Sequence, residues 1–272
     1  MFEEFLNDFA KSFAGKDPMI SKVLANVFSM RIIGNKTHGD LAEIALTEYI
    51  NDYVPGYTAK HTGKEHFRAK QGEEDIQVTQ TSSGEMIPIS IKTYGVGPLQ
   101  LSTNKTSSMF THLSEIVGNR TVTSGDEIRA IVESEAFADF DSVNVLPLIY
   151  DEKRQSFRIQ IFDLAKAYAS VKSVKFLEPR KLGTKMTFPI YKFYGENDQY
   201  IFEVRYGGAG ANALQRGMWT HTVNASPFFR ELLSDTYAIN ESLVRLIAKM
   251  LVSTEATHKR ILEELPSTPD IL

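Results

Sequence analysis

The sequence predicts an α/β (α+β) protein in which helices flank a central mixed β-sheet and the second half is rich in strands. Three observations lead to this prediction. Apolar residues recur at helical spacing near the N-terminus, polar and apolar residues alternate within 75–94, and further strand patterns follow within 144–206. We expect one domain over residues 1–272, because no repeat, low-complexity tract or linker divides the chain.

Helices are expected over residues 2–13 and 19–30, where apolar side chains return every three or four positions. A third helix is expected from Asp40, a suitable N-cap, to about residue 53. Pro55 and Gly56 then end it. This third helix matters because it leads directly into the segment with the strongest strand pattern.

Two strands are expected over residues 75–80 and 86–94, joined by a polar turn that ends in Gly84. The remaining expected elements are helices over about 109–117, 126–137 and 163–171, strands over 144–150, 156–162, 187–194 and 199–206, and a mostly helical tail over 227–265.

The chain has no cysteine, which excludes disulfides, thiolate zinc sites and a cysteine nucleophile. It has no run of about 18 apolar residues, so no membrane span is expected. Its first residues, MFEEFLNDFAKSF, are acidic and amphipathic, unlike a signal peptide. We therefore expect a cytoplasmic protein.

The formal charge is unevenly distributed along the chain. The whole chain carries −4, but residues 153–192 contain ten Lys or Arg against two acids, so this segment carries +8 and the rest −12. A segregated basic segment can attract phosphates although the whole molecule is acidic. The alternative interpretation is a lysine-rich solvated face.

Asp75 and Lys92 stand out in the expected hairpin. Side chains alternate between faces along a strand, so Ser90 and Lys92 share one face while Ile89 and Ile91 share the other. A lysine in so apolar a strand is costly to desolvate unless an anionic group lies nearby. Asp75 can be that group on the neighbouring strand. A simple cross-strand salt bridge is the alternative interpretation.

Glu74-Asp75 at the start of one strand and Ser90-Ile91-Lys92 on the next resemble the PD-(D/E)XK nuclease superfamily, whose members include type II restriction endonucleases. The resemblance covers roughly residues 39–92. It implies a restriction-endonuclease-like fold, with Asp75 as a Mg²⁺ ligand and Lys92 as the group that orients the attacking water. The carbonyl of Ile91 would be a further metal ligand.

Two positions depart from the family pattern. Glu74 stands where the family often has proline, and Ser90 stands where its second acid usually stands. A neutral hydroxyl is a poorer magnesium ligand than a carboxylate. The family often supplies a glutamate from the preceding helix, and Glu43 is the best match here, with Glu48 as the alternative.

The resemblance implies a type II restriction endonuclease that hydrolyses phosphodiester bonds of double-stranded DNA at a specific short sequence, with Mg²⁺ as cofactor. We expect a catalytic core over about residues 36–120 and elements for DNA recognition and oligomerisation over about 140–272. A homodimer suits a palindromic site. The resemblance also implies a bacterial or archaeal source and a cognate DNA methyltransferase.

Three alternatives remain open on the sequence. One is a repair or recombination nuclease of the resolvase type. Another is a non-catalytic DNA-binding protein of the same fold, which Ser90 in place of the second acid favours. The third is an enzyme acting on small nucleotides.

Two polar segments are candidate DNA contacts because hydroxyl, amide and guanidinium groups can bond phosphates and base edges. An ordinary polar loop is the alternative for the first segment, and a tight glycine turn with Trp219 in the core is the alternative for the second. The candidate DNA-binding residues are Gln100, Ser102, Thr103, Asn104 and Lys105 in the first, and Asn212, Gln215, Arg216 and His221 in the second.

Overall fold

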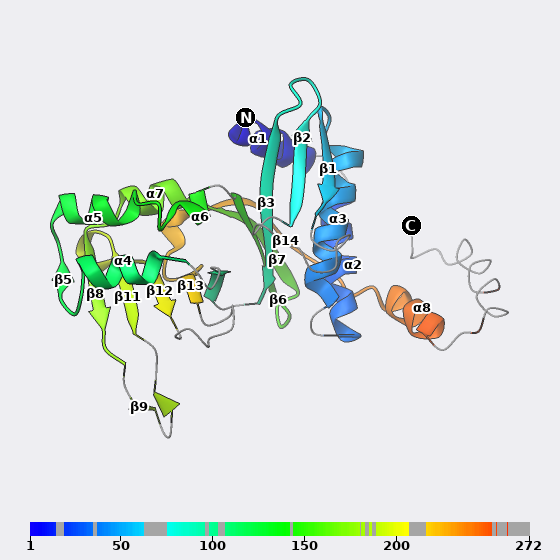
Figure 1. Cartoon of the computed structure of the whole chain (residues 1–272). Helices are drawn as coiled ribbons and strands as arrows, with labels where there is room; N and C mark the ends of the chain where they lie inside the picture. The colour runs from blue at the N-terminus through cyan, green and yellow to red at the C-terminus, as the bar shows by residue number, and fades with distance from the viewer. Residues whose placement is uncertain are drawn as a thin grey trace.

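The computed structural model describes residues 1–14, 19–34, 37–62, 75–95, 98–102, 107–141, 144–179, 181–182, 185–186, 189–206, 216–251, 254 and 260. The chain forms two six-stranded sheets, each with its own hydrophobic cluster and its own helices (Figure 1). The expected α/β class is confirmed. The expected single central sheet is wrong, because half of the long strands belong to a second sheet. A restriction-endonuclease-like fold stays a prediction.

The first sheet has the strand order β1-β2-β3-β6-β7-β14. It is mixed, because β3 and β6 run parallel while all its other neighbours are antiparallel. Its strands are β1 (Tyr57–His61), β2 (Ile76–Gln80), β3 (Met86–Tyr94), β6 (Asn144–Asp151), β7 (Ser156–Phe162) and β14 (Phe229–Thr236).

Three helices bury their apolar sides against one face of this sheet: α1 (Phe2–Ser12), α2 (Met19–Ser29) and α3 (Thr37–Tyr53). In α1, Phe5 and Phe9 are four positions apart and therefore lie on the same side, where both are buried. They meet isoleucines from alternate positions of β2 and β3. The opposite face of the same strands is thereby left to their polar residues. We call this sheet with its three helices the first lobe.

The second sheet has the order β4-β13-β12-β11-β8-β5, and all its neighbours are antiparallel. Its apolar face packs against four helices, with Phe193 and Phe202 stacked at 4.2 Å between ring centroids. We call this assembly the second lobe. Its strands are β4 (Pro98–Ser102), β5 (Thr121–Val122), β8 (Ser173–Leu177), β11 (Ile190–Tyr194), β12 (Tyr200–Tyr206) and β13 (Arg216–His221), and its helices are α4 (Met109–Ile116), α5 (Gly125–Val132), α6 (Ala138–Asp141) and α7 (Leu164–Ala169).

The remaining elements are peripheral to the two sheets. Helix α8 (Glu241–Leu251) packs against α2 and the short helix η1. No helix within the described ranges is long and apolar enough to cross a membrane. The short elements are the two-residue strands β9 (Lys181–Leu182) and β10 (Lys185–Met186) and the 3₁₀ turns η1 (Met30–Ile32), η2 (Glu196–Asp198) and η4 (Ser226–Phe228).

The second lobe is built from two excursions out of the first sheet. The first leaves after β3 and returns at β6, and the second leaves after β7 and returns at β14. The expected division into a core over 36–120 and recognition elements over 140–272 therefore does not match the lobes. Strands β6 and β7 complete the first sheet, whereas β4 and β5 belong to the second. The expected single domain stays a prediction.

Several expected elements have different bounds or types. Helix α3 begins at Thr37, so Asp40 lies in its first turn and is not its N-cap. The helix expected to reach residue 137 ends at Val132. The tail expected to be mostly helical contributes β14 before α8, because pairing with β7 outweighs its local preference. Further strands were not predicted at all, namely β1, β4, β5, β8, β9, β10 and β13.

Burial in the first lobe predicts a contrast between two neighbouring positions of α3. Leu46 is completely buried, whereas Ile44 is 46% exposed. Leu46→Ala should lower the free energy of unfolding by about 2–5 kcal/mol through lost burial and a residual cavity. Ile44→Ala should change it by no more than about 0.5 kcal/mol. Urea denaturation of both variants checks this, and equal effects would contradict the packing described for α3.

Candidate active site

The carboxylate of Asp75 sits where β2 begins. Its backbone N–H donates to the carbonyl of Ile89 at 2.9 Å, and because Ile89 is paired in register with Ile76, this bond is shifted by one residue from the β2–β3 register. Its Oδ2 accepts the hydroxyl of Ser90 at 3.0 Å and the backbone N–H of Ile91 at 2.8 Å. Asp75 is only 2% exposed. The local fold thus holds this carboxylate in a fixed place against β3.

Lys92 approaches the same oxygen. Its Nζ lies 4.0 Å from Oδ2 of Asp75, and the lysine side chain is 23% exposed. The isoleucines at 89 and 91 belong to the core cluster beneath the helices, so Ser90 and Lys92 point to the opposite face. The expected separation of faces is therefore observed. Asp75, Ser90 and Lys92 are brought together, and the accessible member of the group is the ammonium of Lys92.

The backbone carbonyl of Ile91 is directed toward this site. In a strand, the N–H and C=O of one residue point to the same side. Because the N–H of Ile91 bonds to the side chain of Asp75, its carbonyl also faces the end of β2. A magnesium ligand at this position would have to point toward the Asp75 carboxylate, and the Ile91 carbonyl has that direction.

Glu43 reaches the neighbouring strand from helix α3. Its Oε2 lies 2.9 Å from Nε2 of His61, and both side chains are largely buried. His61 is paired in register with Ile76, the residue next to Asp75. Glu43 therefore lies at the same end of the sheet as Asp75, but it approaches from the face that the helices cover. Glu48 is exposed and does not share this position.

His61 is a functional candidate that the sequence did not indicate. Its position depends on β1, which ends opposite the start of β2, and on the contact with Glu43. Residues 57–61 have no apolar alternation strong enough to predict a strand. A lone histidine after an unpredicted strand offers no spacing signal, so only the folded structure could show the pair.

The donor set fits a magnesium ion in chemical type. Magnesium is usually held by one or two carboxylates, with waters and substrate phosphates completing its shell. Asp75, Glu43 and the carbonyl of Ile91 supply only oxygen donors. Within the described part of the chain, no group of three His, Asp or Glu residues gathers in a way that could hold a metal ion. Asp75, Glu43 and His61 are therefore not gathered into one cluster of metal ligands, and an ion shared by Asp75 and Glu43 stays a prediction.

The two segments expected to contact DNA lie side by side in the second sheet. Gln100 of β4 is paired with Trp219 of β13, and Ser102 is paired with Gly217. His221 ends β13 opposite Pro98. These segments are far apart in the sequence, so their adjacency comes from the sheet topology.

Arg216 begins β13, where its backbone is paired with Tyr206. Thr103, Asn104, Lys105, Asn212 and Gln215 lie outside the described residues.

Tyr94 connects the site to this second sheet. It lies on the same face of β3 as Lys92, two positions along. Burial raises the pKa of Tyr94 well above its ordinary value, and the adjacent Thr222 side chain opposes that rise only in part. Its phenol therefore stays neutral at physiological pH. Its side chain packs against the hydrophobic cluster of the second lobe.

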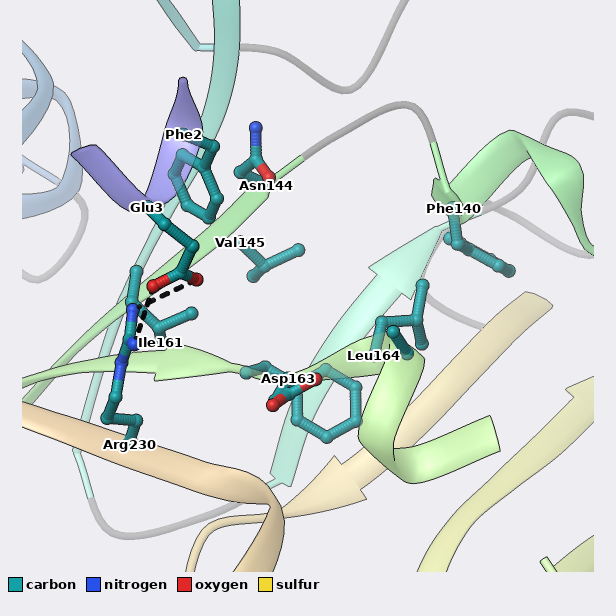
Figure 2. Close-up of a pocket in the computed structure, with 11 residues that line it drawn as sticks. Phe2, Glu3, Phe140, Asn144, Val145, Ile161, Asp163, Leu164 and Arg230 are labelled. Carbon is teal, nitrogen blue, oxygen red and sulfur yellow. Dashed lines mark hydrogen bonds and ion pairs between the residues drawn. The ribbon is translucent and has the colours of Figure 1, made fainter. Parts of the chain in front are cut away.

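A cavity of about 350 Å³ lies near the start of β6 and the end of β7 (Figure 2). Its charged groups serve structural contacts: Arg230 pairs with Glu3 at 2.7 Å, and Asp163 caps helix α7 by accepting the N–H of Lys166 at 2.8 Å. Neither Asp75 nor Lys92 lines it. The cavity therefore does not offer the convergent reactive groups of an active site.

No protein-family model matches this chain, and neither does any curated protein. The chemistry must therefore be argued from the geometry of the Asp75 group and its surroundings.

The hydrogen bonds of Asp75 predict a difference between two substitutions. Asp75→Ala removes the acceptor of the Ser90 hydroxyl and the Ile91 N–H in a buried place, which should lower the free energy of unfolding by about 1–3 kcal/mol. Asp75→Asn keeps a carbonyl oxygen and should cost less. Urea denaturation compares them, and an alanine variant as stable as the wild type would contradict the role given to this carboxylate.

Proposed function

We propose that this protein is a Mg²⁺-dependent endonuclease of the PD-(D/E)XK type that hydrolyses double-stranded DNA at a specific short sequence. The observation that supports the proposal is the Asp75 carboxylate, fixed by Ser90 and Ile91, with the Lys92 ammonium 4.0 Å away on the sheet face turned from the helices. The nearby carboxylate attracts the ammonium and so favours one orientation of the lysine side chain. That is the arrangement needed to present positive charge to an anionic substrate.

The proposed roles follow from the contacts of each residue. A magnesium ion bound by Asp75, Glu43 and the carbonyl of Ile91 would neutralise the phosphodiester and lower the pKa of a water. Lys92, the exposed member of the group, would orient the attacking water and stabilise charge that develops on the phosphoryl oxygens. His61 would hold the Glu43 carboxylate in place through their 2.9 Å contact.

Ser90 has a positioning role in this proposal. Its hydroxyl donates to Asp75 and is completely buried, so it orients the carboxylate and does not act as a ligand itself. The site then has one acid fewer than the family pattern. Glu43 would provide the second carboxylate, from the other side of the sheet end.

The partners follow the same proposal. A homodimer would place two such sites about a twofold axis and so match a palindromic DNA sequence. A cognate DNA methyltransferase and a bacterial or archaeal cytoplasmic setting belong to the same restriction system. A resolvase-type repair nuclease is the alternative within the same chemistry, and discrete bands from plasmid cleavage would distinguish site-specific cutting from structure-dependent nicking.

A non-catalytic DNA-binding protein of the same fold is the second candidate. One observation favours it: Asp75 is buried and already accepts bonds from Ser90 and Ile91. These bonds would also explain Asp75 as a structural residue that holds the start of β2 against β3, without any role in catalysis.

Substitutions at the site separate these candidates. Asp75→Ala and Lys92→Ala should each reduce Mg²⁺-dependent cleavage of long DNA by at least about 100-fold, because transition-state charge loses its stabilisation. Binding measured in Ca²⁺ should persist. Lys11→Ala, which removes an exposed lysine of α1, is the matched control and should cut normally. Removal of Mg²⁺ by EDTA should abolish cleavage, and wild-type rates in both site variants would refute the assignment.

The two glutamates of α3 give a further prediction. Glu43→Gln should reduce cleavage strongly, because a neutral amide binds Mg²⁺ more weakly than a carboxylate does. Glu48→Gln is the control, since Glu48 is exposed on the same helix. The measurement is the Mg²⁺ concentration needed for half-maximal cleavage, which should rise only for Glu43→Gln. A rise for Glu48→Gln instead would assign the helix carboxylate to that residue.

A further inference from the structure

The second sheet has one face that no described helix covers. Its apolar residues, such as Leu101, Val204 and Met218, face α4, α5, α6 and α7, which all contribute to the same hydrophobic cluster (Figure 1). Side chains at the alternate positions of each strand point the other way. We call the surface formed by these alternate residues the open face.

A row of polar and aromatic residues crosses the open face from one edge to the other. Each residue of the row is paired in register with the next on the neighbouring strand. At about 4.8 Å per strand, such a row is about 24 Å wide. In order across the sheet, the row consists of Gln100, Trp219, Glu203, Lys192, Lys175 and Thr121.

The cations of this face are held in fixed positions. Glu203 is buried at the centre, with a side chain only 5% exposed, and it pairs with Lys192 at 3.6 Å and with Arg205. The guanidinium of Arg205 lies 4.5 Å from the centre of the Trp219 ring. A buried carboxylate and an aromatic ring thus order two cations that remain partly accessible, at 29% exposure for Lys192 and 38% for Arg205.

Lys175 extends the same arrangement toward the β8 edge. Its Nζ lies 4.8 Å from the centre of the Tyr194 ring and 2.7 Å from Asp198. Ordinary surface lysines are mobile and well solvated. Here each cation is anchored by a ring or a carboxylate, so less conformational entropy is lost when a ligand binds.

We propose that the open face binds the phosphate backbone of double-stranded DNA. Lys175 and Lys192 face each other on adjacent strands, and Arg205 lies diagonally from Lys192, which gives intervals of roughly 5 and 7–8 Å. Each strand of a duplex carries one negative charge per roughly 3.4 Å of helix axis. Because the strand winds around that axis, neighbouring phosphates are farther apart than this rise, on the same scale as the intervals between the cations. The identity of the partner as DNA rests on the proposed function.

The second sheet is joined to the strand of the candidate active site by the chain itself. Strand β4, its edge strand, follows β3 in the chain soon after Lys92, and Tyr94 lies beside Thr222 at the end of β13. Gln100 and His221, expected from the sequence to contact DNA, are both on this face.

One further feature agrees with an anionic ligand. The indole N–H of Trp219 is buried and has no hydrogen-bond acceptor among the described residues. A phosphate or base oxygen can supply that acceptor.

The experiment measures binding separately from cleavage. A labelled 30-base-pair duplex is titrated with the full chain in Ca²⁺ at several salt concentrations, and anisotropy reports the affinity. Lys175→Ala should lower the slope of log affinity against log salt by about 0.9, and the affinity about eightfold at 0.1 M salt, as expected for one lost phosphate contact. Arg129→Ala is the matched control, because Arg129 is an exposed cation paired with Glu133 on the helical side of the same lobe.

A second variant tests the centre of the face. Lys192→Gln is combined with Glu203→Gln so that no buried carboxylate loses its partner, and thermal unfolding verifies that the variant folds. It should lose affinity to a similar extent. Unchanged affinity and salt slope in both variants, or an equal loss in Arg129→Ala, would overturn the proposal. Tighter binding of a single strand than of the duplex would also overturn it.

The outcome is independent of the catalytic assignment. If Asp75→Asn binds the duplex as wild type while Lys175→Ala does not, the open face is supported whether or not the wild type cuts. If the wild type cuts DNA and Lys175→Ala binds the duplex normally, the proposed nuclease activity is supported and DNA binding by the open face is refuted.

Discussion

The hydrogen bonds of the Asp75 carboxylate are the constraint on which the candidate site depends. One oxygen accepts from the Ser90 hydroxyl and the Ile91 N–H, and the Lys92 ammonium lies 4.0 Å from it. A buried carboxylate is tolerated only when donors surround it. The same bonds that meet this requirement fix the start of β2 against β3, so strand pairing and site geometry have a common cause.

The two lobes are connected by chain segments that pass from one sheet to the other. The first sheet buries its isoleucines under α1, α2 and α3, which leaves Ser90 and Lys92 on the far side. Chain segments that leave this sheet after β3 and β7 then build the second sheet next to it. Strand β4, at the edge of the second sheet, begins four residues after the end of β3. The strand that carries Lys92 is therefore close in the chain to that edge.

Glu43 and His61 illustrate how a second acid can compensate for the missing one. Ser90 cannot bring a negative charge, and Glu43, the second carboxylate of the proposal, comes from a helix on the covered side of the sheet. Its contact with His61 at 2.9 Å ties that helix to β1, whose end lies next to the start of β2. The proposed magnesium site thus depends on the packing of α3 as much as on the hairpin.

The sequence by itself determined the α/β class, the first two helices, the β2–β3 hairpin, and the faces on which Asp75, Ser90 and Lys92 lie. These follow from local periodicity, because a strand alternates every two residues and a helix repeats every 3.6. Only the tertiary structure decided that two sheets form, that Glu43 meets His61, and that Gln100 lies opposite Trp219. Those contacts join segments that are far apart in the chain. The pairing of such strands depends on which surfaces are buried together, and local sequence patterns do not contain that information.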